Sequence, residues 1–269
     1  MPTKLDVKYV DELLKNRLPE RHDKVAAAME YSLFTGGKRA RPLLLLYTAR
    51  AVGGKITPNA KTLAAALEFI HTYSLIHDDL PCMDNDDIRR GKRSCHMQYG
   101  EASAVLAGDA LLNLAAETTF DGNFDDKNYK EACKALFHYS GIGGMIHGQS
   151  LDLFTETHGL DDANSVALHK TGDLIRAAFV CGALCGGAKQ NEVAVFDKIG
   201  EKFGIAYQVV DDMLDKEKCE RSFLDILSPS DCLEYATKLT DEICALCDEL
   251  PYDLAFVKDY AAKNLARKY

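Results

Sequence analysis

The chain has 269 residues, of which 47% are hydrophobic and 27% charged, and its formal net charge is −9. These proportions are typical of a protein with an ordinary buried core, and the acidic balance argues against a nucleic-acid-binding protein, which needs a basic face. An anionic small-molecule substrate is still compatible, because a local group of Lys and Arg overrides a weak global field.

The amino-terminal segment is charged and amphipathic, so we do not expect a signal peptide there. No apolar run reaches 18 residues, so we expect no membrane span. Nine cysteines are scattered through apolar or helical contexts, which is typical of a protein of the reducing cytosol. Cys244 and Cys247 form a CxxC without a second pair or a nearby His, and we interpret them as structural thiols rather than a metal or redox site.

Helical periodicity runs through nearly the whole sequence, and no segment alternates apolar and polar residues convincingly as a strand would. Short breaks rich in Gly, Pro or Asn separate the periodic segments, without a long linker or an internal repeat. We therefore predict one all-α domain over residues 1–269, with about ten helices. In chain order, periodic segments cover 7–17, 59–77, 101–119, 128–155, 164–185, 191–215, 230–249 and 252–267.

A first acidic cluster interrupts the apolar segment 59–77. It places five aspartates within ten residues: Asp78, Asp79, Asp84, Asp86 and Asp87. Their mutual repulsion requires a compensating positive charge, and the carboxyl end of a helix is electrostatically the wrong end for carboxylates. Pro81 breaks the helix, so the chain can turn and bring Asp84 back toward Asp78. The cluster indicates a bound cation, and the alternative is a solvated acidic helix end.

A second acidic cluster consists of Asp211, Asp212 and Asp215, after another apolar helical run. Asp211 and Asp215 are four residues apart and share one face of a helix. Two such clusters could face each other across a cavity. Carboxylates with coordination positions left for water suit Mg²⁺, which is usually held by a few carboxylates together with substrate phosphates.

Basic residues accompany these clusters. Gly36 and Gly37 precede Lys38, Arg39 and Arg41, and a flexible Gly pair lets backbone amides approach a phosphate. Further cations lie in the run 89–93, directly after the first acidic cluster, and at Lys170, which has a hydroxyl neighbour. Arg offers bidentate recognition of phosphate and Lys a point charge. Each run alone is also typical of an exposed basic turn.

These motifs resemble those of the trans-prenyl diphosphate synthases of the bacterial farnesyl and geranylgeranyl type, from about residue 25 to the end. The family's first aspartate-rich motif, in its longer DDxxxxD form, reads 78–84 and is followed by Arg-Arg-Gly. Its second, DDxxD, reads 211–215 after an FGxAYQ-like run. GGKRxRP at 36–42, Gly-Gln-Ser-Leu-Asp at 148–152 and Lys-Thr-Gly at 170–172 also match.

The resemblance implies an isoprenoid-synthase-like helical bundle around a central cavity, a cytoplasmic homodimer and three Mg²⁺ ions. The reaction it implies joins an allylic diphosphate (dimethylallyl or geranyl) to isopentenyl diphosphate. The product expected is farnesyl diphosphate, C15. Ser74 is small enough to let the growing isoprenoid tail pass, and the bulky Tyr73 beside it, five residues before the first motif, would stop the tail at C15. The alternatives are a geranylgeranyl or geranyl diphosphate synthase.

The resemblance also implies roles for single residues. Asp78 and Asp84 would ligate two ions, with Asp79 and Asp152 assisting, and Asp211 a third, with Asp212 and Asp215 acting largely through water. Arg89 and Lys170 would bind the allylic diphosphate. Oxygen dipoles of Thr171, Gln208 and the Lys170 carbonyl would face the developing carbocation. The isopentenyl diphosphate would be bound by Lys38, Arg41, His71 and Arg90.

One departure concerns the segment after the second motif. The family usually has a longer loop there with a Gly-Lys-(Ser/Thr)-Thr element, whereas here six residues separate Asp215 from Ser222. The Lys of that element is absent or replaced by Lys216, Lys218 or Arg221. A weakly active or non-catalytic partner subunit is therefore a second hypothesis, although both aspartate motifs are intact. Arg267-Lys268-Tyr269 resembles the basic tail that closes over the site.

Two other classes of protein fit the sequence less well. A terpene cyclase would share the fold and the first motif, but it would not need Lys38, Arg41 and Arg90, and its second motif usually mixes Asn, Ser and Glu. An acidic helical scaffold that binds divalent cations would leave the accompanying basic segments without a purpose.

Overall fold

Polar side chains cap the beginnings of several helices. In each case a short side chain accepts a hydrogen bond from a backbone amide of the first turn, which has no partner within the helix. The capping pairs are Asp6 with α1 (Val7–Lys15), Asp23 with α2 (Lys24–Phe34), Thr57 with α4 (Pro58–Asp78), Asp126 with α7 (Lys127–Ser140) and Ser228 with α12 (Pro229–Asp248).

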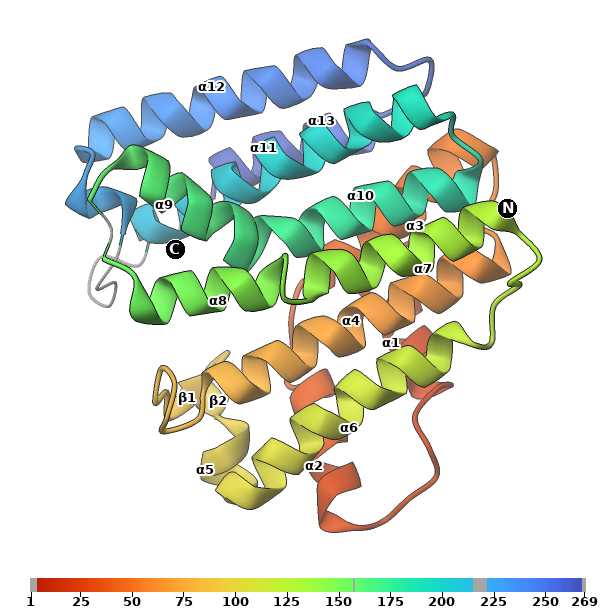
Figure 1. Ribbon diagram of the computed structural model, residues 1–269, viewed down its shortest axis with the longest axis vertical. Coiled ribbons are helices and arrows are strands. Elements are labelled where there is room, and N and C mark those ends of the chain that lie inside the picture. The colour runs from red at the N-terminus through yellow and green to blue at the C-terminus, as the bar shows by residue number, and fades with distance from the viewer. Residues whose placement is uncertain (1–3, 157, 215–221, 268–269) are drawn as a thin grey trace.

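The computed structural model describes residues 4–156, 158–214 and 222–267. Within these ranges the chain forms thirteen α-helices, most of them lying side by side in a helical bundle (Figure 1). The remaining helices are α3 (Ala40–Gly53), α5 (Cys95–Tyr99), α6 (Glu101–Thr119), α8 (Met145–Phe154), α9 (Leu160–Val166), α10 (Asp173–Gly186), α11 (Gln190–Leu214) and α13 (Ala255–Leu265).

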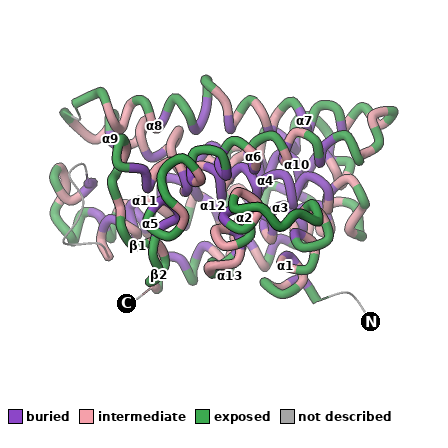
Figure 2. The backbone as a smooth tube through the Cα atoms, turned by 90° about the horizontal axis from the view of Figure 1, so that it is seen from below, coloured by how far each residue is buried: buried purple, intermediate pink, exposed green. Residues whose placement is uncertain are grey.

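Helices α4 and α10 form the centre of the bundle, as their apolar circumferences predict. Helix α4 packs against α3, α6 and α10, and α10 packs in turn against α3, α7 and α11. Figure 2 shows buried residues concentrated along α4 and α10. The main core includes Phe69 of α4, Phe179 of α10 and Phe203 of α11, each no more than 1% exposed. The all-α prediction is confirmed.

The segment 128–155, expected as one helix, is two. Helix α7 ends at Ser140 and α8 begins at Met145. Between them the backbone doubles back so closely that a Cβ at Gly144 would lie 2.1 Å from the Tyr139 carbonyl oxygen. Only glycine fits at position 144, so the two helices are separated there although apolar periodicity continues across the break.

Two further details differ from the sequence reading. The helical segment expected from 164 to 185 begins at Leu160 and contains a six-residue π-helical turn, Ala167–Gly172 (η1), between α9 and α10. The basic run 89–93, in which no strand was expected, is a small antiparallel hairpin of β1 (Ile88–Arg89) and β2 (Lys92–Arg93). Its two central residues have φ of 54° and 74°, the left-handed conformation that two-residue hairpin turns require.

Among the described residues, none of the helices combines the length and the apolar character needed to cross a membrane.

Candidate active site

Most of the residues singled out in the sequence line one cavity of about 920 Å³. Its walls come mainly from the carboxyl end of α4, the turn after it, α8, η1 and α11, together with the short 3-10 helix Phe223–Asp225 (η2), and α3, β1, α9 and α10 contribute single residues or pairs. The predicted residues that line it are Arg41, His71, Ser74, Asp78, Asp84, Arg89, Asp152, Lys170, Thr171, Gln208, Asp211 and Asp212. Asp215 lies outside the described residues.

The turn after α4 brings Asp84 back to Asp78, as the Pro81 break predicts. Helix α4 ends at Asp78, and the Asp84 amide then donates to the Asp78 carbonyl oxygen at 2.9 Å. The Asn85 amide donates to the Leu80 carbonyl oxygen at 3.1 Å, with Asn85 in the left-handed region at φ 52°. Both carboxylates line the cavity as a result.

Asp79 does not line the cavity. It is 2% exposed and accepts hydrogen bonds from Arg89, whose Nε lies 2.8 Å away and whose Nη2 also contacts Asp86. A buried carboxylate that accepts from a guanidinium fixes its direction. Asp79 therefore orients Arg89, which does line the cavity.

The π-helical turn points Lys170 and Thr171 into the cavity from between α8 and α11. Lys170 Nζ donates to Asp152 of α8 at 2.5 Å, and the Thr171 hydroxyl donates to Gln208 Oε1 of α11 at 2.8 Å. Because the Thr171 hydroxyl proton points at Gln208, the lone pairs of the Thr171 oxygen point away from Gln208.

Two glycines let the neighbouring helices approach this turn closely. A Cβ at Gly148 of α8 would lie 2.0 Å from the Lys170 amide nitrogen, and one at Gly204 of α11 would lie 2.2 Å from the Gly172 Cα. On α8, Gly148 lies four residues, or one helical turn, before Asp152, which bonds Lys170. On α11, Gly204 lies the same distance before Gln208, which bonds Thr171. The sequence reading missed both glycines as site residues, although each falls within a matched motif.

On α11, the two adjacent aspartates have different partners. Asp211 accepts from Arg267 Nη1 at 2.5 Å, and the Arg267 guanidinium also lies 5.1 Å from the ring centroid of Tyr207. Asp212 is 3% exposed and accepts from Gln208 Nε2 and from the Phe223 amide, each at 2.8 Å. The Asp212 carboxylate thus fixes both Gln208 and the start of η2.

A basic wall is formed by Arg41 and His71. Arg41 Nη1 lies 3.2 Å from His71 Nε2. Burial, with the nearby cations Arg41 and Arg90, lowers the pKa of His71 well below its ordinary value. The ring is therefore neutral and accepts the Arg41 hydrogen bond. Arg41 Nε is buried and has no hydrogen-bond partner in the part of the chain described.

Two expected members of the basic group lie outside the cavity lining. Lys38 is exposed. Arg90 donates to the Gly36 carbonyl oxygen, and its guanidinium occupies the space that a side chain at position 37 would fill, 2.8 Å from the Cβ position. The third cation of this segment, Arg39, turns inward instead: it is 3% exposed and pairs with Glu68 of α4 and Asp11 of α1, each at 2.8 Å.

The sequence reading missed this anchoring role of Arg39 and Glu68. A charged residue in the middle of the otherwise apolar segment 59–77 was the signal, because a buried charge requires a partner.

Of the two residues expected to limit the length of the product, one lines the cavity and the other lies in the core. Ser74 lines the cavity. Tyr73 is 6% exposed and packs edge-on against His77, with ring centroids 5.8 Å apart, and is not among the cavity-lining residues.

The electrostatics of the cavity suit a hard cation. Burial raises the pKa of Asp78 to about 7, with Asp84 contributing in the same direction and Lys170 opposing it. In the described part of the chain, no three His, Cys, Asp or Glu side chains are gathered into a closed metal site. Mg²⁺ does not need one, because it keeps several waters and takes one or two carboxylates together with substrate phosphates. The donor set therefore fits Mg²⁺.

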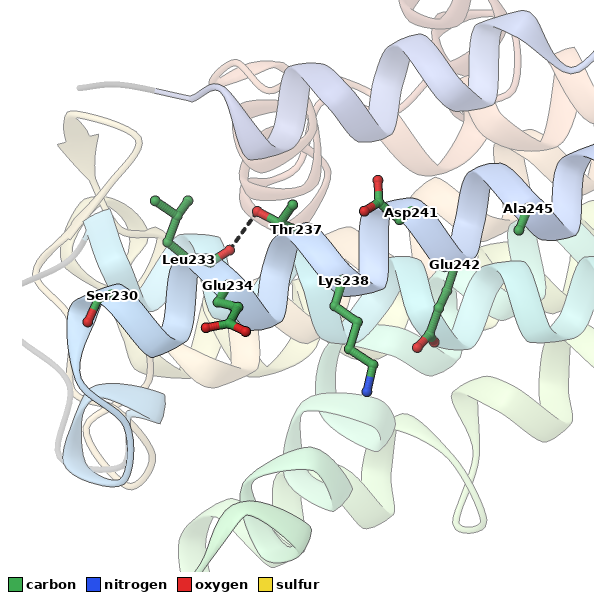
Figure 3. Close-up of a pocket in the computed structure, with 8 residues that line it drawn as sticks. All are labelled: Ser230, Leu233, Glu234, Thr237, Lys238, Asp241, Glu242 and Ala245. Atoms are coloured by element: carbon green, nitrogen blue, oxygen red, sulfur yellow. Dashed lines mark hydrogen bonds between the residues drawn. The ribbon is translucent and has the colours of Figure 1, made fainter.

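A second hollow, of about 760 Å³, runs along the outer side of α12 (Figure 3). All its lining residues, from Ser230 to Ala245, belong to this one helix, and it contains none of the predicted site residues. The site therefore lies in the first cavity.

Comparisons with known proteins agree with this geometry. The family model described as polyprenyl synthetase matches residues 22–223. The chain is 46% identical to the farnesyl diphosphate synthase of Escherichia coli over 204 residues, which cover 74% of this chain and 68% of that protein. It is 43% identical to geranylgeranyl pyrophosphate synthase 4 of Arabidopsis thaliana over 71% of this chain, but spans only 52% of that protein's length.

Among solved structures, a geranyltransferase from Legionella pneumophila superposes with a TM-score of 0.87 at 31% identity, covering 97% of this chain and 94% of that one. The fold class expected from the sequence is thus shared with this structure along nearly the whole chain. Together with the matched family model and the cavity, this shows that the protein belongs to the polyprenyl synthetase family and is a prenyltransferase of isoprenoid biosynthesis.

Proposed function

We propose that this protein is a short-chain trans-prenyl diphosphate synthase. It condenses dimethylallyl or geranyl diphosphate with isopentenyl diphosphate, and its main product is farnesyl diphosphate, C15. The observation that carries the proposal is that acidic and basic groups share one cavity: Asp78 and Asp84 approach from α4 and the turn after it, Asp211 approaches from α11, and Arg41 and His71 also line it. One diphosphate bound through metal and one bound without metal, by the Arg41 cation beside the neutral His71 ring, would fit this division.

Asp78, Asp84 and Asp211 are proposed to hold three Mg²⁺ ions, assisted by Asp79, Asp152, Asp212 and Asp215. The bound ions would neutralise the departing diphosphate as Lewis acids. Arg89, held in direction by Asp79, and Lys170 would bind the same diphosphate. The cations remain attached to the chain when the carbon–oxygen bond breaks, so they stabilise the leaving group without reorganisation.

Isopentenyl diphosphate is proposed to bind to Arg41 and His71, with Lys38 and Arg90 contributing from outside the cavity lining. Its double bond attacks the allylic carbon, a carbon–carbon bond forms, and a proton is then lost, with the released diphosphate as acceptor. Thr171, whose hydroxyl proton is committed to Gln208, would turn oxygen lone pairs toward the cationic carbon. Water must be excluded during this step, because it would capture the cation.

Two wider features belong to the same proposal: one domain over residues 1–269 and a homodimer. Apolar side chains of α6 remain exposed in the single chain, among them Leu106 at 53% and Val105 at 41%, and a second copy would cover them. Light scattering of the purified protein measures its molar mass in solution and so distinguishes a monomer from a dimer. That the protein works in the cytosol, as its cysteine usage predicts, remains a prediction.

The decisive test is product sizing. The protein is incubated with isopentenyl diphosphate, each allylic primer and Mg²⁺, and the products are separated by chain length. C15 as the main product supports the proposal. C20 would instead support a geranylgeranyl diphosphate synthase, as among the Arabidopsis relatives, and no product from any primer would favour the non-catalytic partner subunit.

Two kinds of variant extend this test. Asp78→Ala and Asp211→Ala should each lower turnover by orders of magnitude while the fold stays intact by circular dichroism. Near-normal turnover in both would refute the metal assignment. Tyr73→Ala should lengthen the product if Tyr73 bounds the space for the tail from behind Ser74. An unchanged product length would reject that role.

A further inference from the structure

The π-helical turn that carries Lys170 and Thr171 requires support from outside itself. A π-helix is rare and occurs mainly as single-turn insertions within α-helices, frequently at functional sites. On the cavity side, Gly148 and Gly204 let two helices press against the turn. These contacts limit how far the turn can move, but a smooth backbone contact does not by itself fix its rotation about the helix axis.

Away from the cavity, the turn is held by a polar contact. His169, which directly precedes Lys170, has its Nδ1 2.8 Å from Asp173 Oδ2. Asp173 is the first residue of α10, is 1% exposed, and accepts from Arg176 Nη1 at 3.0 Å with its other oxygen. Neither His169 nor Asp173 is among the described residues that line the cavity.

Arg176 continues the connection to two other helices. Its Nε and Nη2 donate to the two carboxylate oxygens of Asp197 on α11, at 2.7 and 2.8 Å. Asp197 also accepts from the Tyr139 hydroxyl of α7 at 2.7 Å, and the Arg176 guanidinium lies 4.8 Å from the Tyr139 ring centroid. A two-bond Arg–carboxylate contact fixes orientation as well as distance.

We propose that His169 and Asp173 are positioning residues for the prenyl transfer. Through them, the Arg176–Asp197 pair sets the rotation of the π-helical turn and so directs Lys170 and Thr171 into the cavity. The inference rests on the proposed function in one respect: it takes Lys170 as a ligand of the allylic diphosphate. Lys170 needs this support because a cation on a flexible stem binds well only if its backbone is fixed.

The test is a comparison of kinetic constants in Asp173→Asn and His169→Ala. In both, the Michaelis constant for the allylic diphosphate should rise and kcat fall, lowering kcat/KM for that substrate at least about ten-fold. The Michaelis constant for isopentenyl diphosphate should stay within about two-fold, because Arg41 and His71 lie on other elements. General destabilisation would reduce the active fraction without such a split.

Two further arms keep the result interpretable. Asp259→Asn removes the same charge from an exposed i,i+4 ion pair with Lys263 and should change none of the constants. Because both side chains act through one contact, the double variant should be no worse than the poorer single variant. His169 is a partly exposed residue, so His169→Ala decides the matter if Asp173→Asn does not fold.

Lys170→Gln serves as the reference. If it raises the Michaelis constant for the allylic diphosphate while folded His169→Ala and Asp173→Asn do not, the positioning role is overturned and the proposed function stands. If Lys170→Gln also leaves that constant unchanged, the assignment of Lys170 fails, and the inference fails with it.

Discussion

Gly204→Ala tests the close approach between α11 and the π-helical turn. The added Cβ would lie 2.2 Å from the Gly172 Cα, whereas nonbonded carbon atoms settle about 3.5–4.0 Å apart. The obstacle is backbone, so the two helices must separate locally by at least about 1.3 Å. The hydrogen bond from Thr171 to Gln208, now 2.8 Å, would then lengthen to about 4 Å and be lost.

The expected costs follow from this displacement. Inserting a methyl group into a packed contact destabilises by about 1–3 kcal/mol, which corresponds to a fall in Tm of roughly 2–12 °C for a chain of this size. A misplacement of about 1 Å in a catalytic group lowers turnover roughly 100-fold. Differential scanning calorimetry and turnover at saturating substrates measure the two effects separately.

Gly159→Ala is the matched control. Gly159 precedes α9 with an extended backbone at φ −175°, and nothing lies within 4 Å of its Cβ position, so Tm and turnover should both be preserved. Turnover of Gly204→Ala within two-fold of the wild type would show that the glycine contact does not position Thr171, even if Tm fell as expected.

Two other predictions concern charges at the cavity. Arg267→Gln removes the guanidinium that pairs with Asp211 and competes with Mg²⁺ for its carboxylate. Since a partly exposed ion pair contributes up to about 1 kcal/mol, Mg²⁺ should bind the variant up to about five-fold tighter in a calorimetric titration without substrates. Weaker binding would show that Arg267 and Mg²⁺ do not compete for Asp211. His71→Gln removes a ring whose pKa is lowered in the folded protein by burial and by Arg41. The wild type therefore keeps its full stability above the unfolded pKa of about 6.5 and loses it as the pH falls below. Between pH 7.5 and 5.5 its free energy of unfolding in urea should fall by about 1 kcal/mol more than that of His71→Gln, whereas parallel curves would show that the ring is protonated equally in both states.

The sequence was sufficient for the all-α class and for the turn after α4, since Pro81 and the aspartate spacing specify that turn locally. It was not sufficient where long-range backbone contacts decide. The break between α7 and α8 depends on how closely Gly144 approaches Tyr139, and the π-helical turn depends on two neighbouring helices. In both places the apolar periodicity alone reads as an uninterrupted helix.

Side-chain direction was also beyond the sequence. Lys38, Arg39 and Arg41 form one basic run, yet Arg41 faces the cavity, Arg39 is buried against Glu68, and Lys38 is exposed. Arg39 is the residue just before α3 and has φ 50°, which redirects the chain at that point. Helical periodicity does not predict an arginine with a left-handed backbone conformation, so the sequence could not tell which of the three cations faces the cavity.

The site's internal ion pairs explain how so many carboxylates are tolerated around one cavity. Asp79, Asp152 and Asp211 pair respectively with Arg89, Lys170 and Arg267, and without these partners the carboxylates would repel one another. Arg89 and Lys170 also line the cavity, so an arriving diphosphate competes with the carboxylates for the same donors. Binding of an anion then leaves the carboxylates in need of another cation, which Mg²⁺ can supply. Diphosphate and metal should therefore bind cooperatively, because each restores the charge balance that the other disturbs.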